Sequence, residues 1–167
     1  MYWSEHSILK LNPTRIGSLL FLMWGILHIW VALEGAYQYA NGGVSAQWAM
    51  LIGGIKAPYI AFQNASDNIT LNVHSQLLLN FCLDVGGYGV LGIFVAWMLW
   101  YNPAPFCYFL GLVVIGVGDL AFTFSLLTPG IIALNIGTIG GPALWLLAAI
   151  ITPFGIWPSQ RVTRLHQ

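Results

Sequence analysis

The chain has 167 residues, of which 58% are hydrophobic and 14% aromatic, whereas only 6% are charged. Soluble domains carry roughly 25% charged residues, so five basic and five acidic side chains are too few to cover the surface of a water-soluble fold. The basic residues form no patch, which argues against nucleic acid as a partner. The composition therefore predicts an integral membrane protein whose first partner is the lipid bilayer.

Four segments are long and apolar enough to cross a bilayer, whose core needs about 20 mostly apolar residues per helix. They are predicted at about residues 16–38, 77–101, 106–127 and 131–153. Short links rich in proline and glycine join the last three, so these helices are expected to be antiparallel neighbours. The sequence predicts an all-α fold, a four-helix bundle that forms a single transmembrane domain over residues 1–167.

The basic residues predict the orientation of this bundle. Lys10 and Arg15 precede the first span, Arg161 and Arg164 follow the last, and only Lys56 lies between them. Cytoplasmic flanks of membrane helices carry an excess of lysine and arginine. Both termini are therefore expected in the cytoplasm.

The one long connection, residues 39–76, is predicted to lie on the outer side and to be partly structured. Two glycine pairs, Gly42-Gly43 and Gly53-Gly54, bracket residues 44–52, which could form a short interfacial helix. Long ordered loops tend to be functional, and we expect this loop to fold over the outer end of the bundle.

Glycines are expected to bring the helices together, because association in lipid depends on close packing of small residues. The candidates are Gly86 and Gly89 in the second span, Gly118 in the third, and Gly137 and Gly141, a small-xxx-small pair, in the fourth. These glycines are expected to pack helices within one chain or to form a dimerisation face.

Polar residues inside the spans form a predicted intramembrane cluster of His28, Glu34, Asn80, Asp84 and Asp119. Ionisable residues at membrane depth are costly, so each is a functional candidate. By position they collect in the outer half of the bilayer. Asn80 and Asp84 are four residues apart and share one helix face, whereas His28 and Glu34 are separated by about 120° around the helix.

Two interpretations of this cluster remain open. Asp84 and Asp119 could be neutral hydrogen-bonding groups that join helices, or the cluster could bind a proton, a metal or the polar head of a lipid-like molecule. A metal, if one is bound, would use His28, Asp84 and Asp119. Haem binding by two histidines is disfavoured because His28 and His74 lie at different depths, and no cofactor is favoured.

No motif predicts a catalytic residue: phosphate loops, nucleophile elbows and paired-cysteine redox motifs are all missing from the sequence. The chain is therefore expected to be a protein other than an enzyme.

The first span opens with Arg15-Ile-Gly-Ser-Leu-Leu-Phe-Leu-Met-Trp-Gly-Ile-Leu-His28, a long outer loop follows, and Asp84-Val-Gly-Gly-Tyr-Gly begins a glycine-rich run. In this layout the sequence resembles the DoxX-like group of small four-helix bacterial membrane proteins. The resemblance implies a bacterial inner membrane. It also implies either a link to quinone-coupled oxidation or a place as a subunit of a larger complex.

Three functions are therefore considered. The favoured one is a small non-catalytic subunit that packs against larger membrane proteins, or against itself, and stabilises a complex. The second is a quinone- or metal-interacting component of a membrane oxidoreductase that uses His28, Asp84 and Asp119. The third is a small proton-coupled carrier that uses the buried carboxylates.

Overall fold

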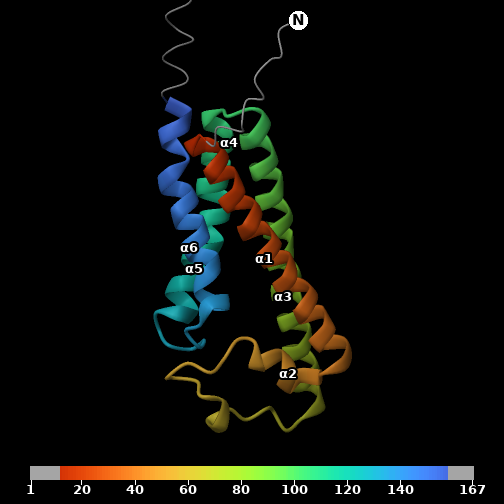
Figure 1. Ribbon diagram of the computed structural model, residues 1–167. Coiled ribbons are helices and arrows are strands. Elements are labelled where there is room, and N and C mark those ends of the chain that lie inside the picture. The colour runs from red at the N-terminus through yellow and green to blue at the C-terminus, as the bar shows by residue number, and fades with distance from the viewer. Residues whose placement is uncertain (1–11, 158–167) are drawn as a thin grey trace, which may run out of the picture.

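The structure of the protein, a computed structural model, describes residues 12–157 (Figure 1). Within this range four helical segments are long and apolar enough to cross a membrane: Pro13–Asn41, Asn68–Tyr101, Pro105–Leu127 and Ile136–Trp157. No strand occurs among the described residues. The predicted all-α class is thus confirmed, and the four long apolar helices agree with the predicted membrane helical bundle. Lys10, Arg161 and Arg164, on which the predicted orientation depends, lie outside the described residues.

The first two spans are single helices, α1 (Pro13–Asn41) and α3 (Asn68–Tyr101). The third span consists of α4 (Pro105–Leu110), a π-helical turn at Gly111–Ile115, α5 (Gly116–Phe122) and a second π-helical turn at Thr123–Leu127. The fourth span begins as α6 (Ile136–Ile151). We call the end of the bundle near residues 12 and 157 the inner end, and the end that carries residues 42–67 the outer end.

Helix caps move several ends away from the predicted positions. Asp67 accepts a hydrogen bond from the Thr70 backbone N–H at 2.7 Å, so α3 begins at Asn68, nine residues before the predicted span. Asn135 and Thr138 form a reciprocal capping box, so α6 begins at Ile136 and not at residue 131. The outer loop is correspondingly shorter than 39–76, because α1 continues to Asn41.

The outer loop contains α2 (Gly43–Ala49) and a short 3-10 helix, η1 (Tyr59–Ala61). It crosses beneath the bundle to the link between the third and fourth spans (Figure 1). There the Gly54 N–H donates to the Ile131 carbonyl at 3.0 Å, and the Lys56 N–H donates to the Gly130 carbonyl at 2.8 Å. These bonds connect a loop that leaves α1 to the opposite side of the bundle.

Two glycines allow α1 and α3 to meet backbone to backbone. A Cβ atom at Gly25 would lie 2.6 Å from the Gly89 carbonyl oxygen, and a Cβ at Gly89 would lie 2.8 Å from the Gly25 carbonyl oxygen. Any larger residue would push the helices apart. Gly25 and Gly89 therefore set the close approach of this helix pair.

At the inner end, α1 also packs against the fourth span, where Gly17 lies against Thr152 and Gly155 against Thr14. The apolar core fills this end and is built from all four spans, with Phe21, Trp24, Val95, Leu99, Ile115 and Ile156 fully buried. Toward the outer end the pair α1–α3 diverges from the pair α5–α6 (Figure 1). A cavity lies between the two pairs in the outer half of the bundle.

Candidate intramembrane binding site

A cavity of about 910 Å³ lies between the two helix pairs in the outer half. Residues of α1, the outer loop, α3, α5 with its following π-helical turn, and the start of α6 line it. The lining is mostly apolar and rich in aromatic rings, among them Trp24, Trp30, Trp48, Phe81, Tyr88 and Phe122. No lysine or arginine occurs among the described residues that line it.

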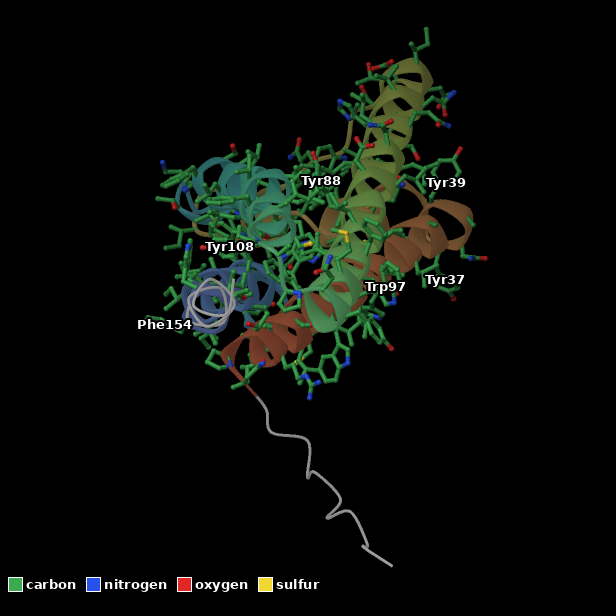
Figure 2. All side chains as sticks on the ribbon, turned by 90° about the horizontal axis from the view of Figure 1, so that it is seen from above. Tyr37, Tyr39, Tyr88, Trp97, Tyr108 and Phe154 are labelled. Carbon is green, nitrogen blue, oxygen red and sulfur yellow. The ribbon has the colours of Figure 1, made fainter. Side chains whose placement is uncertain are left out.

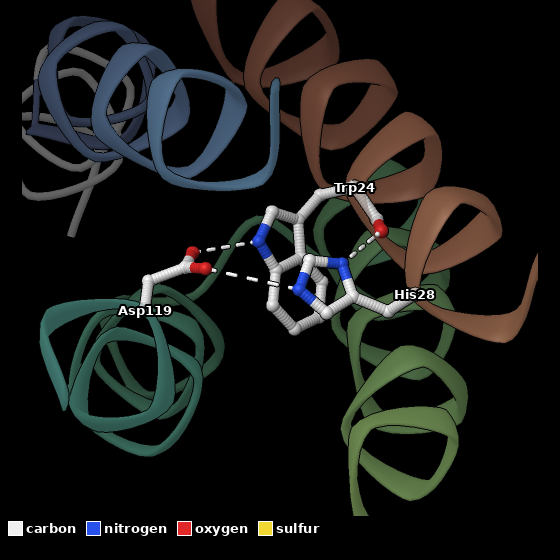
Figure 3. A network of polar contacts seen from close by, with 3 residues as sticks. All are labelled: Trp24, His28 and Asp119. Carbon is white, nitrogen blue, oxygen red and sulfur yellow. Dashed lines mark hydrogen bonds and ion pairs between the residues drawn. The ribbon is translucent and has the colours of Figure 1, made fainter. Parts of the chain in front are cut away.

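The inner wall of the cavity is formed by Trp24, His28 and Asp119 (Figure 3). Trp24 and His28 are one helical turn apart on α1, which stacks their rings at a centroid distance of 3.6 Å. Asp119 faces them from α5, and its Oδ2 accepts a hydrogen bond from the Trp24 indole N–H at 2.6 Å. Trp24 and Asp119 are only 1% and 3% exposed, so this contact is formed away from solvent and lipid.

Hydrogen bonding determines which nitrogen of His28 carries a proton. Nδ1 lies 2.8 Å from the Trp24 carbonyl oxygen, and because a carbonyl can only accept, Nδ1 is the donor. In the neutral ring Nε2 is then an acceptor. It lies 3.7 Å from Asp119 Oδ1, which is too far for a direct hydrogen bond.

Two acceptor atoms that face each other across this gap repel, and one proton on either His28 Nε2 or Asp119 Oδ1 would remove this repulsion. With that proton the pair has no net charge, whether it is an imidazolium with a carboxylate or an imidazole with a carboxylic acid. The pair can therefore donate to a polar group in the cavity and also accept from it.

Gly141 of α6 packs directly against His28 and lies close to Asp119. A Cβ atom there would lie 2.9 Å from His28 Cε1 and 3.5 Å from Asp119 Oδ1, so a larger residue would displace the imidazole. On α5, Asp119 stands between the two π-helical turns at 111–115 and 123–127. Such turns are frequent at functional sites because they re-aim the residues around them.

Farther out, Glu34 and Asp84 line the same cavity. A Cβ at Gly86 would lie 2.6 Å from the Ala32 side chain, and Gly35 lies against Cys82. Glu34 lies between Ala32 and Gly35 on α1, and Asp84 lies between Cys82 and Gly86 on α3. They therefore belong to one layer of the α1–α3 pair.

Each of these two carboxylates has a neutral amide partner on its own helix. Gln38 Nε2 donates to Glu34 Oε1 at 2.6 Å, and Asn80 Nδ2 donates to Asp84 Oδ2 at 2.9 Å. The amides satisfy one oxygen of each carboxylate but supply no positive charge.

The predicted cluster is thus divided into two groups. His28 meets Asp119, whereas Glu34 and Asp84 form the outer layer with Asn80 beside Asp84. Within residues 12–157 no group of three histidine, cysteine, aspartate or glutamate side chains is placed to hold a metal ion. His28, Asp84 and Asp119 accordingly do not converge on a common point.

The glycine candidates also have different surroundings. Gly86 and Gly89 meet α1, and Gly141 meets His28. A Cβ at Gly118 would come no closer than 4.0 Å to the Tyr88 ring of α3, and a Cβ at Gly137 would meet only Asn135, the cap of its own helix. Gly118 and Gly137 therefore do not mediate close helix packing in this structure.

Trp24 is the site residue that sequence reasoning missed. An isolated tryptophan in an apolar span is typical of core packing or of the membrane interface. Its position one turn before His28 was the available signal, because residues four apart share a helix face.

Fold and site together define a class, a four-helix membrane protein with a cavity inside its bundle. Comparison with known proteins finds no matching protein family, no matching curated protein and no matching solved structure. The resemblance to the DoxX-like group stays a prediction.

Proposed function

We propose that this chain binds a lipid-soluble organic molecule within the bilayer and holds its polar head against His28 and Asp119. The observation that carries the proposal is the cavity of about 910 Å³, with mostly apolar walls that end on a buried hydrogen-bonding pair. Small-molecule sites have volumes of about 300–1,000 Å³ and combine apolar walls with a few polar groups that orient the ligand.

A path from the bilayer to the cavity supports this function. Tyr88 of α3 and Val117 of α5 line the cavity and are 38% and 61% exposed. Tyr88 lies in the space between α3 and α5 (Figure 2), and a Cβ atom at Gly118 of α5 would lie 4.0 Å from its ring. A lipid-soluble molecule can therefore reach the cavity sideways, without crossing the outer loop.

The quinone-interacting function considered from the sequence is one form of this proposal. A ring carbonyl would accept a hydrogen bond from whichever of His28 Nε2 and Asp119 Oδ1 carries the proton, and a ring hydroxyl would donate one to the other. The proposal includes a bacterial inner membrane with both termini in the cytoplasm. In that arrangement the cavity lies in the outer half of the bilayer, and reporter fusions at the two termini test the orientation.

To test binding, a large side chain is introduced into the cavity, and the lipid-soluble compounds that co-purify with the protein are compared with those of wild type. The full chain is purified in mild detergent, and its lipid-soluble contents are extracted and identified by mass spectrometry. Val85 lines the cavity, whereas Val90 of the same helix is 61% exposed outside it. Val85→Trp should lose a compound that wild type and Val90→Trp both retain. Identical extracts from all three proteins would reject the proposal.

A second function, the non-catalytic subunit of a larger complex, is supported by an aromatic ladder on α3. Phe94, Trp97 and Tyr101 follow one another with ring centroids 5.9 Å apart and are 48%, 58% and 73% exposed. Trp97 projects on the side of α3 away from the fourth span (Figure 2). Aromatic anchors of this kind are enriched at protein interfaces.

Mild native purification tests this second function. A larger membrane protein should co-purify in fixed stoichiometry with wild type and be lost with Trp97→Ala. The matched control is Trp30→Ala, which changes an exposed tryptophan of α1 on the cavity side. A chain that purifies alone would reject the subunit function.

A further inference from the structure

We infer that the ligand of the cavity is a lipophilic cation, an organic molecule with a positively charged centre among apolar groups. This inference rests on the proposed binding function and names the chemical class of the ligand. It follows from the charges that line the cavity and from the position of the aromatic rings beside them.

With Glu34 and Asp84 ionised, the charge balance of the lining is negative. Glu34 and Asp84 share one layer of the α1–α3 pair, and among residues 12–157 each is hydrogen-bonded only to a neutral amide. His28 and Asp119 together carry no net charge, and His74, the remaining histidine of the lining, is positive only when protonated. Carboxylates at membrane depth are costly unless paired, and a ligand cation between them would lower that cost.

Each of the two carboxylates has an aromatic ring one helical turn deeper on the same face. Trp30 precedes Glu34 by four residues on α1, and Tyr88 follows Asp84 by four residues on α3. All four residues line the cavity. Because the helices are antiparallel, the two rings fall in one layer directly inside the carboxylate layer.

Stacked layers of this kind suit a positive centre. Aromatic faces attract organic cations, and the attraction increases where water is excluded. A cation held beside Trp30 and Tyr88 would be close enough to be attracted by both carboxylates. Its apolar groups would pack against the aromatic walls of the cavity. An anionic head would meet two like charges and, among the described lining residues, no lysine or arginine.

Two ions that share four phenyl groups and differ in the sign of their charge provide the test. The full chain in phosphatidylcholine nanodiscs is dialysed against tetraphenylphosphonium or tetraphenylborate at about pH 8, where ordinary histidine is neutral. Binding to empty nanodiscs is subtracted. We expect saturable, protein-dependent binding of tetraphenylphosphonium and none of tetraphenylborate.

Charge-neutralising variants then locate the effect. Glu34→Gln and Asp84→Asn should each weaken tetraphenylphosphonium binding at least tenfold, because a unit charge within about 12 Å contributes that much at an effective dielectric constant of about 20. Asp67→Asn is the matched control. It removes a carboxylate from the outer loop, and asparagine caps a helix as well as aspartate does.

The outcomes separate this inference from the function on which it rests. Equal binding of both ions would overturn the cation inference alone. So would tetraphenylphosphonium binding that is as strong in both variants as in wild type. A neutral short-chain benzoquinone that binds while tetraphenylphosphonium does not would overturn it as well and would support the binding function. If none of the three probes binds, the proposed function itself fails.

Discussion

The indole N–H of Trp24 donates a hydrogen bond of 2.6 Å to Asp119, a residue 95 positions later in the chain. This bond joins α1 to α5 across the two helix pairs, at the point where the tightly packed inner half meets the cavity. It satisfies a buried N–H and a buried carboxyl oxygen at once. The same carboxyl group faces His28 with its other oxygen.

Loss of the acceptor should destabilise the fold. Asp119→Leu leaves the Trp24 N–H buried without a partner and should lower the free energy of unfolding by about 1–3 kcal/mol. Asp119→Asn retains a carbonyl oxygen and should lower it less. Unfolding in mixed micelles by added sodium dodecyl sulfate, followed by circular dichroism, measures both. Equal losses in the two variants would show that the hydrogen bond contributes little.

A methyl group at Gly141 should disturb the site through His28. A Cβ there would lie 2.9 Å from His28 Cε1, whereas a Cβ at the neighbouring Gly140 would meet Leu27 at an ordinary 3.5 Å. Gly141→Ala should therefore be less stable than Gly140→Ala by about 1–3 kcal/mol. It should also bind tetraphenylphosphonium or benzoquinone more weakly. Equal stability and equal ligand binding in Gly141→Ala and Gly140→Ala would contradict the proposed contact of Gly141 with His28.

The contact between α1 and α3 predicts a strong position dependence for alanine. Gly25→Ala places a methyl group against the Gly89 backbone and should cost about 1–3 kcal/mol or more. At Gly87, where nothing lies within 4 Å of an added Cβ, alanine should be neutral or stabilise the helix by up to about 1 kcal/mol. The same micelle titration compares them, and a stable Gly25→Ala chain would disprove the close approach.

The cap of α3 predicts an acid-sensitive helix start. The hydrogen bond from the Thr70 backbone N–H holds the pKa of Asp67 below its ordinary value of 3.8. A lowered pKa in the folded state means that the cap stabilises the helix at neutral pH and that this stabilisation is lost as the pH falls below about that value. The protection of the amides of residues 68–71 against hydrogen exchange, taken relative to the intrinsic exchange rate at each pH, should therefore fall on acidification in wild type.

Asp67→Asn separates charge from capping. Asparagine still accepts the bond from Thr70 but does not titrate, so exchange at residues 68–71 should show no acid step in this variant. In Asp67→Ala the protection of these amides should be low at every pH. An acid step of equal size in Asp67→Asn would assign the effect to another group.

Individual residues show how far the sequence could predict this structure. The four spans follow from apolar length alone, and Asn80 with Asp84 follows from helical periodicity. The outward extension of α3 depends on the Asp67 cap, a local signal within a polar segment that apolar length does not detect. The placement of Asp119 against Trp24 has no local signal, because the two residues belong to helices that only the bundle brings together.

Apolar composition and helical periodicity thus determine by themselves that the chain forms four helices long and apolar enough to cross a membrane, with the ionisable residues inside these spans toward one end. Those properties depend on the free energy of transferring each side chain from water to lipid and on the repeat of the α-helix. Both can be read from the local sequence. Only the tertiary structure decides that α1 and α3 close on Gly25 and Gly89 while α5 and α6 diverge from them. The cavity arises from that difference in packing, and packing depends on which side chains of distant segments meet.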